Sequence, residues 1–210
     1  MWPAYPAAPE PKRWQNKKGD RIQEQITGLP DELTIRVTSE VSIRLMRRDD
    51  SKEFYRMIDC YRFDLRRWLS WVDDVKCEED ITRRYDQSSR SKSEGRSLRF
   101  FVLHKESIIG MLAAKRIDWE PRLAELSYSL DPTFRGCGII TNACRELMSY
   151  FESAYGIVNF EIRTAIGNLA SERIAENLGF DLIKIQERAE NLYGDWVDHK
   201  IYANWVGTGD

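Results

Sequence analysis

The sequence is poor in the side chains that hold metals or build disulfide frameworks. It has two histidines and four cysteines in 210 residues. His104 and His199 are isolated, and a lone histidine is more often structural than a ligand. The cysteines show neither zinc-site spacing nor the density of a disulfide scaffold; they are Cys60, Cys77, Cys137 and Cys144. We therefore expect free thiols in a reducing cytoplasm and no metal site.

Long apolar runs and a strong net charge are also missing. No run approaches the roughly 20 apolar residues that span a membrane, and residues 1–6 lack the basic start and apolar core of a secretory signal. The net charge of −2 gives no indication of nucleic-acid binding. The hydrophobic content of 42% is typical of a globular protein. A cytoplasmic protein that binds neither DNA nor a membrane is expected.

Proline is unevenly distributed and divides the chain. Five of the seven prolines fall within residues 1–33, beside several basic residues and without hydrophobic periodicity. Such composition favours a partly disordered extension or linker, although an arm that binds a partner is an alternative. Residues 34–210 are expected to form one folded domain.

The remaining pattern predicts the order β α α β β β α β α β β, an α/β or α+β fold. Polar residues 87–95 are expected to form a loop, and residues 187–195 a linker between the last two strands. Helices are expected after residues 49–50, up to about residue 90, at 140–155 and from 168 to 178. Strands are expected at 41–46, 98–103, 107–117, 122–130, 158–164, 180–185 and 196–205, with an optional first strand around 33–37.

One stretch, residues 127–141, reads as a strand, a glycine-containing turn and a helix start. The turn is Arg135-Gly-Cys-Gly138-Ile-Ile140. Glycines permit unusual φ angles, and the free N–H groups of a helix N-terminus bind anions. The stretch is either a pyrophosphate cradle or an ordinary loop with two glycines. At Cys137 the backbone amide, not the sulfur, is expected to matter.

Two tryptophans precede a run of acids. Trp68 and Trp71 are three residues apart and would share a helix face, and five acids follow within residues 73–80. Aromatic rings beside carboxylates suit a cationic or planar ligand. The alternative is that both tryptophans are core residues and the acids form a solvated face.

Taken together, residues 41–206 resemble the GNAT acetyltransferase superfamily, and within it the RimJ/RimL-type ribosomal-protein N-terminal acetyltransferases. The family's acetyl-CoA motif, Gln/Arg-x-x-Gly-x-Gly/Ala, is met by the glycine turn except at its last position, Ile140. Further matches to the subgroup are Leu65-Arg-Arg-Trp-Leu-Ser-Trp-Val-Asp73, Ala124-Glu-Leu-Ser-Tyr-Ser-Leu130, Asn168-Leu-Ala-Ser171 with Asn177-Leu-Gly-Phe180, and Ala189-Glu190 with Gly194-Asp-Trp-Val-Asp-His199.

The resemblance implies a GNAT fold, with a central mixed, mostly antiparallel sheet of about six to seven strands flanked by helices. It also implies acetyl-CoA as co-substrate. The pantetheine arm would pair with the strand at residues 127–130, and the pyrophosphate would bind the helix N-terminus. The residues implied in this binding are Ser129, Leu130, Arg135, Gly136, Cys137, Gly138, Ile139, Ile140, Thr141 and Asn168.

The implied reaction is direct attack of a neutral amine on the thioester. Glu190 is the first candidate base and Glu125 the second; a surface salt bridge and a buried structural carboxylate are their respective alternatives. Ser171 would donate to the leaving thiolate, unless it only bonds the backbone in its helix. The acceptor wall would be formed by Trp68, Trp71 and Asp73.

These expectations describe an acetyl-CoA-dependent N-acetyltransferase acting on an α-amine, with a ribosomal-type protein N-terminus as acceptor. An alternative is detoxification, or self-immunity, by acetylation of an amine-bearing antibiotic such as an aminoacyl-nucleotide or an aminoglycoside-like compound. A non-catalytic acyl-CoA-binding regulatory module, with residues 1–33 as its arm, is a third. The amine acceptor is the expected partner, and a homodimer is one option for assembly.

Overall fold

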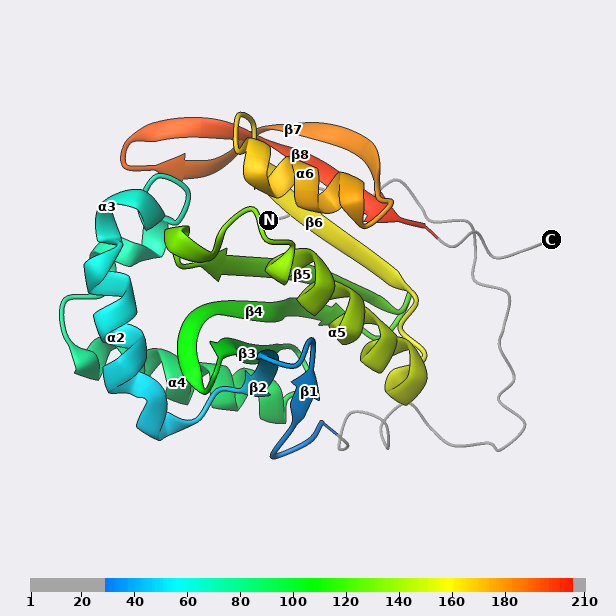
Figure 1. The fold of residues 1–210 in the computed structure, drawn as a ribbon. Coiled ribbons are helices and arrows are strands. Elements are labelled where there is room, and N and C mark those ends of the chain that lie inside the picture. Colours follow the sequence, from blue (N-terminus) through cyan, green and yellow to red (C-terminus); the bar gives the residue numbers. More distant parts are fainter. Residues whose placement is uncertain (1–28, 206–210) are drawn as a thin grey trace.

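The computed structural model describes residues 29–205, which form one eight-stranded sheet with helices on both faces (Figure 1). The strand order is β1-β2-β3-β4-β5-β6-β8-β7. The strands are β1 (Thr34–Arg36), β2 (Val41–Leu45), β3 (Leu98–His104), β4 (Ser107–Asp118), β5 (Leu123–Leu130), β6 (Asn159–Ala165), β7 (Asp181–Leu192) and β8 (Asp195–Asn204). The helices are α2 (Ser51–Cys60), α3 (Arg62–Leu65), α4 (Glu78–Ser93), α5 (Ile139–Tyr155) and α6 (Leu169–Asn177), with 3-10 turns η1 (Arg48–Asp50), η2 (Ser70–Asp74) and η3 (Pro132–Phe134).

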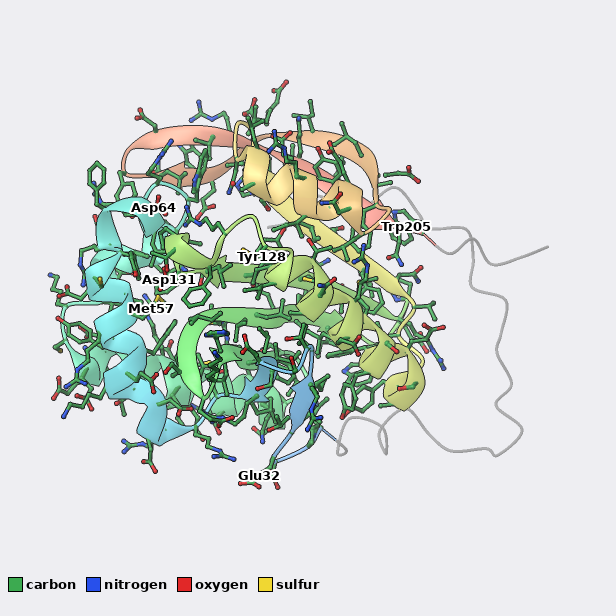
Figure 2. The ribbon with its side chains drawn as sticks, viewed as in Figure 1. Glu32, Met57, Asp64, Tyr128, Asp131 and Trp205 are labelled. Atoms are coloured by element: carbon green, nitrogen blue, oxygen red, sulfur yellow. The ribbon has the colours of Figure 1, made fainter. Side chains whose placement is uncertain are left out.

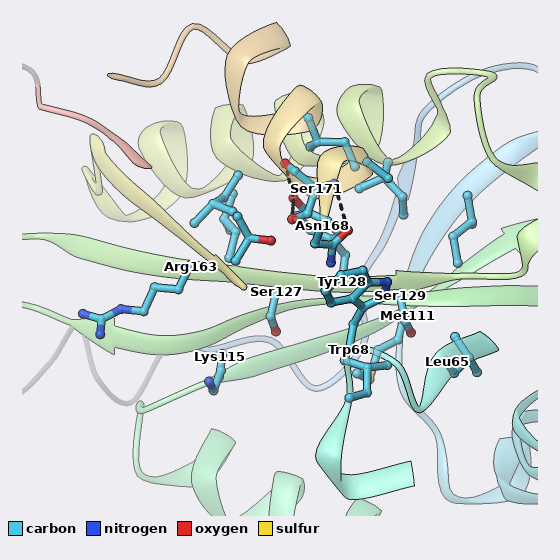
Figure 3. A pocket seen from close by; sticks show the side chains of 18 of the residues that line it. Leu65, Trp68, Met111, Lys115, Ser127, Tyr128, Ser129, Arg163, Asn168 and Ser171 are labelled. Carbon is cyan, nitrogen blue, oxygen red and sulfur yellow. Dashed lines mark hydrogen bonds between the residues drawn. The ribbon is translucent and has the colours of Figure 1, made fainter. Parts of the chain in front are cut away.

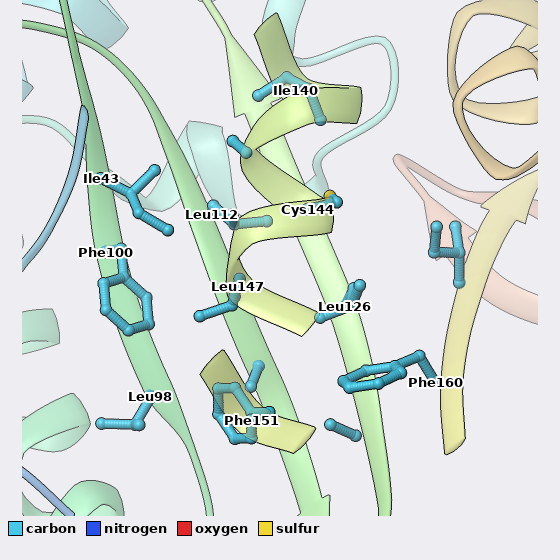
Figure 4. Close-up of a cluster of buried hydrophobic side chains, with 14 of the residues drawn as sticks. Ile43, Leu98, Phe100, Leu112, Leu126, Ile140, Cys144, Leu147, Phe151 and Phe160 are labelled. Carbon is cyan, nitrogen blue, oxygen red and sulfur yellow. The ribbon is translucent and has the colours of Figure 1, made fainter. Parts of the chain in front are cut away.

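The two faces of the sheet have separate cores. The apolar stripe of α5 packs on one face, where Leu147 and Phe151 meet Phe100, Leu112 and Leu126 (Figure 4). On the other face, α2 and α4 cover strands β3 and β4 with a second cluster of buried side chains. The members of that cluster include Phe54, Ile58, Ile81, Phe101, Leu103 and Met111. The sheet is thereby fixed from both sides at its centre.

The one parallel pair of the sheet opens towards its end. β5 and β6 pair in register from Leu123–Asn159 to Leu126–Ile162, whereas every other neighbouring pair is antiparallel. From Ser127 to Leu130, β5 stays paired with β4 but has no register partner on β6. The β6 side of this segment therefore offers backbone groups to another extended chain.

The expected mixed, mostly antiparallel architecture is confirmed, but two expected boundaries are wrong. Residues 87–93 are not a loop, because α4 continues to Ser93, with basic residues in its last turn that favour the helix dipole. Residues 187–195 are not a linker, because β7 continues to Leu192 and turns directly into β8. Two register shifts in β7 break the alternation that marks a strand in sequence.

The expectation that Trp68 and Trp71 share one helix face is also wrong. Helix α3 ends at Leu65, and Leu69 adopts an extended conformation before η2 begins. The two indoles therefore come from different local structures, a turn and a 3-10 segment. Leu29 and Leu33, within the expected extension, pack against the core. Residues 1–28 of that extension, and residues 206–210 at the other end, lie outside the described residues.

None of the described helices is long and apolar enough to cross a membrane.

Candidate functional site

A cavity of about 1170 Å³ opens beside the splayed part of the sheet. Its lining comes from all strands between β3 and β8, the loop after α3, helices α4 and α6, and the start of α5. Figure 3 shows Asn168 and Ser171 at one end of the view, Trp68, Leu65 and Met111 at the other, and Tyr128 between them. The cavity thus brings the glycine turn together with residues from Met46 to His199, far from it in the sequence.

The glycine turn leads directly into the N-terminus of α5. Gly136 and Gly138 have φ angles of 80° and 72°, a region that costs other L-residues about 1–2 kcal/mol. A Cβ on Gly136 would meet nothing within 4 Å, so the angle, not the space, requires glycine there. No side chain caps α5 at Gly138, which leaves its first N–H groups and positive dipole end facing the cavity. The arrangement suits a phosphate group.

Arg135 precedes the turn and is already paired. Its guanidinium donates to the carboxylate of Asp64 in α3 and to the carbonyl of Leu130, 3.4 Å away. Figure 2 shows Asp64 on the helical segment facing the strand that ends before the turn. Cys137 is exposed and does not line the cavity, whereas Ile139, Ile140 and Thr141 do.

The start of α6 brings a serine to a buried tyrosine. Asn168 is the N-cap, and its side chain accepts from the Ser171 backbone N–H at 3.3 Å. The Ser171 hydroxyl lies 2.9 Å from the Tyr128 hydroxyl, and burial raises the pKa of Tyr128 well above its usual value. Tyr128 therefore stays protonated at any physiological pH. Tyr128 lies within the Ala124–Leu130 family match, which by itself indicates no role for this side chain.

Glu190 reaches the cavity from β7. The Ser70 hydroxyl donates to its Oε1 at 2.7 Å, and the Nε2 atom of His199 lies 3.4 Å from its Oε2. The nearby His199 lowers the pKa of Glu190, against an opposing effect of desolvation, and the Ser70 bond lowers it further. The carboxylate is therefore ionised and able to accept a proton at neutral pH.

Glu125 is more deeply buried and held between two cations. It is 6% exposed. Lys115 Nζ donates to its Oε1 at 3.3 Å, and Arg163 Nε lies 3.8 Å from its Oε2. The carboxylate lines the cavity, but its charge is already balanced by groups of this chain.

Of the three expected acceptor residues, the structure brings two to the cavity. Trp68 and Trp71 line it, and the guanidinium of Arg84 lies 5.0 Å from the Trp71 ring centre. Asp73 does not line it and instead accepts from Arg66 at 2.6 Å. Ser70 and His199 both fall within the quoted family matches, but nothing local in the sequence indicates that either side chain meets Glu190.

The protein-family model for the acetyltransferase (GNAT) domain matches residues 40–181 of this sequence. The chain belongs to the GNAT acetyltransferase family. It is 26% identical over 175 residues to the ribosomal-protein-serine acetyltransferase of Escherichia coli strain K12, which covers 83% of this chain and 98% of that protein.

Solved structures agree on the fold. The RimL ribosomal L7/L12 alpha-N-protein acetyltransferase in complex with coenzyme A superimposes with a TM-score of 0.80 at 22% identity, over 83% of this chain and 98% of that one. The microcin C7 self immunity acetyltransferase MccE, in complex with acetyl-CoA and AMP, gives a TM-score of 0.79 at 25% identity, over 86% and 99%. The expectation of a RimL-like, acetyl-CoA-dependent N-acetyltransferase is confirmed at the level of the family.

Proposed function

We propose that this enzyme transfers an acetyl group to the α-amine of a protein N-terminus, with Glu190 as the base and Ser171 as the proton donor to the leaving thiolate. The observation that carries the proposal is the position of the ionised Glu190 carboxylate. It lines the same cavity as Ser171, the splayed part of β5 and the uncapped start of α5.

The co-substrate supplies an activated thioester, and the cavity offers two kinds of groups to hold it. The first N–H groups of α5 suit its pyrophosphate. The unpaired edge of β5, with Ser129 and Leu130, suits an extended pantetheine arm as an added strand. Because these donors are main-chain groups, Ile140 at the last motif position does not interfere with them.

An α-amine is a favourable acceptor for a base of this strength. Its pKa is about 7.7–8.0, against about 10.4 for a lysine side chain. A part of the α-amine is therefore neutral at physiological pH, and a carboxylate acting directly or through one water can take the remaining proton. Glu190 suits this better than Glu125, because Glu125 is already paired with Lys115 and lies near Arg163.

The departing thiolate needs a hydrogen-bond donor, since a thiol has a pKa of only about 8.5. The Ser171 hydroxyl is such a donor, and the Tyr128 hydroxyl at 2.9 Å orients it. Because Tyr128 remains protonated, its hydroxyl can donate to the Ser171 oxygen while the Ser171 hydroxyl donates to the thiolate.

An aminoacyl-nucleotide is the second candidate acceptor. MccE carries AMP beside acetyl-CoA and superimposes about as well as RimL does. Trp68 and Trp71 in the cavity lining offer flat surfaces on which a base could stack. No described feature favours the non-catalytic alternative, since Glu190 and Ser171 both face the cavity.

The test uses acetyl-CoA with three acceptors. The first is a peptide with a free α-amine, and the second is the same peptide with its α-amine blocked and with one internal lysine. The third is an aminoacyl-nucleotide. We expect release of CoA thiol with the free peptide, and an added acetyl mass on its first residue. Transfer only to the aminoacyl-nucleotide would favour the second candidate. Transfer to neither, with acetyl-CoA bound, would refute the proposed function.

A further inference from the structure

The cavity wall formed by β3, β4 and α4 carries more positive than negative charge. Its cations are Arg84, Arg99 and Lys115. Lys115 donates to Glu125 at 3.3 Å, and Arg84 donates to Asp74 at 3.3 Å. Within residues 29–205, Arg99 has no such carboxylate. Described carboxylates thus balance two of the three charges, and none balances the third.

Arg99 is partly buried, and its guanidinium forms no ion pair with the part of the chain that the structure describes. Its Nε atom is shielded from solvent and makes no hydrogen bond to any described residue. Desolvation lowers the pKa of Arg99, and the neighbouring Arg84 lowers it further. A buried charge left unpaired is costly. The arrangement is therefore unfavourable in the free protein and would be relieved by an anion entering the cavity.

The strand register places Arg99 relative to the splayed segment. Arg99 pairs with Ala113 of β4, and Ala113 pairs with Ser127 of β5. Residues paired in this way share a face of the sheet, so Arg99 and Ser127 are two strand spacings apart, roughly 10 Å at about 4.8 Å each. Ala113 lies between them, and its small side chain leaves room for a ligand group above the sheet. Ser127 is the first residue of β5 beyond its pairing with β6.

Helix α4 adds neutral polar groups to the same wall. Gln87, Ser88 and Ser91 line the cavity beside Arg84. A hydroxyl and an amide can donate to an anion without bringing a competing charge. Among the acids between residues 73 and 80, Asp74 pairs with the wall cation Arg84, whereas Asp73 binds Arg66 and Asp80 accepts from the Lys76 backbone N–H at 2.7 Å. None of these three carboxylates pairs with Arg99.

We propose that Arg99 binds an anionic group, a carboxylate or a phosphate, which the acceptor carries roughly 10 Å from its reactive amine. The proposal rests on the proposed function for the position of the amine at the splayed strand. In an extended peptide this distance corresponds to about three residues; in an aminoacyl-nucleotide it corresponds to the phosphate. The acids at 73–80 led to the expectation of a cationic or planar ligand; the Arg99 site adds an anionic group to the amine-bearing acceptor.

The test compares two peptides that differ only in a glutamate or a glutamine at their third residue, together with AMP as a phosphate probe. Binding to the CoA-loaded enzyme is measured by calorimetry, and acetylation by CoA release. The variants are Arg99→Gln, Arg99→Lys and the control Arg56→Gln, whose side chain is exposed on α2 outside the cavity lining. Thermal unfolding checks that each variant folds.

We expect the glutamate peptide to bind about tenfold more tightly than the glutamine peptide, and Arg99→Gln to remove that difference while Arg56→Gln keeps it. Arg99→Lys should retain a part of it. Loss of AMP binding in Arg99→Gln with no change for the peptides would assign the anion to a phosphate. The KM for acetyl-CoA should stay unchanged, and the melting temperature should not fall, because an unpaired charge has been removed.

The proposal would be overturned if Arg99→Gln bound both peptides and AMP as tightly as the unaltered enzyme does. A raised KM for acetyl-CoA in Arg99→Gln, with unchanged acceptor binding, would also overturn it. These outcomes are separate from the fate of the proposed function. Equal acetylation of both peptides, with AMP binding unaffected by Arg99→Gln, would leave the function intact and refute the anion site. Charge-dependent binding without acetylation of any amine would retain the anion site and refute the function.

Discussion

The hydroxyls of Tyr128 and Ser171 lie 2.9 Å apart, although 43 residues separate them in the chain. Tyr128 belongs to the splayed part of β5, and Ser171 to the first turn of α6. The contact therefore connects the strand that would bind pantetheine to the proposed proton donor. It also gives the serine a structural partner whose removal can be separated from removal of the serine itself.

Ser171→Ala should lower kcat by about 10²-fold, because general acid catalysis contributes typically 10²–10⁴-fold. Tyr128→Phe should lower it less, about tenfold, since Ser171 keeps its hydroxyl and loses only its orienting partner. The KM for acetyl-CoA should change little in both. Steady-state kinetics measure these values. An equal loss in both variants, or no loss in Ser171→Ala, would show that the serine is not the donor.

Glu190→Gln should lower kcat/KM across the whole pH range. The pKa of Glu190 is below its usual value because of His199, so the carboxylate is ionised throughout the range above about pH 4.5. The acidic limb of the wild-type profile should therefore follow the acceptor amine, near its pKa of about 8. The variant should show the same limb and a plateau about 10²-fold lower. A plateau equal to that of the wild type would remove Glu190 as the base.

Gly138→Ala should raise the KM for acetyl-CoA about tenfold, because alanine at a φ of 72° is strained by about 1–2 kcal/mol and the turn would shift. Gly179→Ala is the matched control. Its φ is 80°, nothing lies within 4 Å of the added Cβ, and it follows α6 outside the cavity lining. Both variants should lose stability, but only Gly138→Ala should weaken acetyl-CoA binding. Equal KM values would disprove the role of the turn.

Asp64→Asn should tighten CoA binding about two- to fivefold at low salt. The Asp64 carboxylate pairs with Arg135 and therefore competes with the pyrophosphate for the Arg135 guanidinium. Both side chains are partly exposed, so the effect is modest and screened by salt. Asp59→Asn is the control, since Asp59 pairs with Arg62 instead. Weaker binding in Asp64→Asn, measured by calorimetry, would mean that Asp64 orients Arg135 for the ligand.

The parts of the site that are local in sequence could be predicted from it. The glycine turn, the start of α5 and the Asn168 cap depend on residues within a few positions of one another. The Ser70–Glu190 bond joins residues 120 positions apart, and it could not be predicted, because two register shifts hide the end of β7. The ion pairs of the acids at 73–80 could not be predicted for a related reason: a run of charges does not reveal which arginines will pair with it.

The most direct test of the central claim is the site of acetylation on a peptide that carries both a free α-amine and one lysine. After incubation with acetyl-CoA, fragment masses locate the added acetyl group. The proposed chemistry predicts the α-amine, at a rate that falls about 10²-fold in Glu190→Gln and in Ser171→Ala. Acetylation of the lysine side chain instead, or unchanged α-acetylation in both variants, would contradict it.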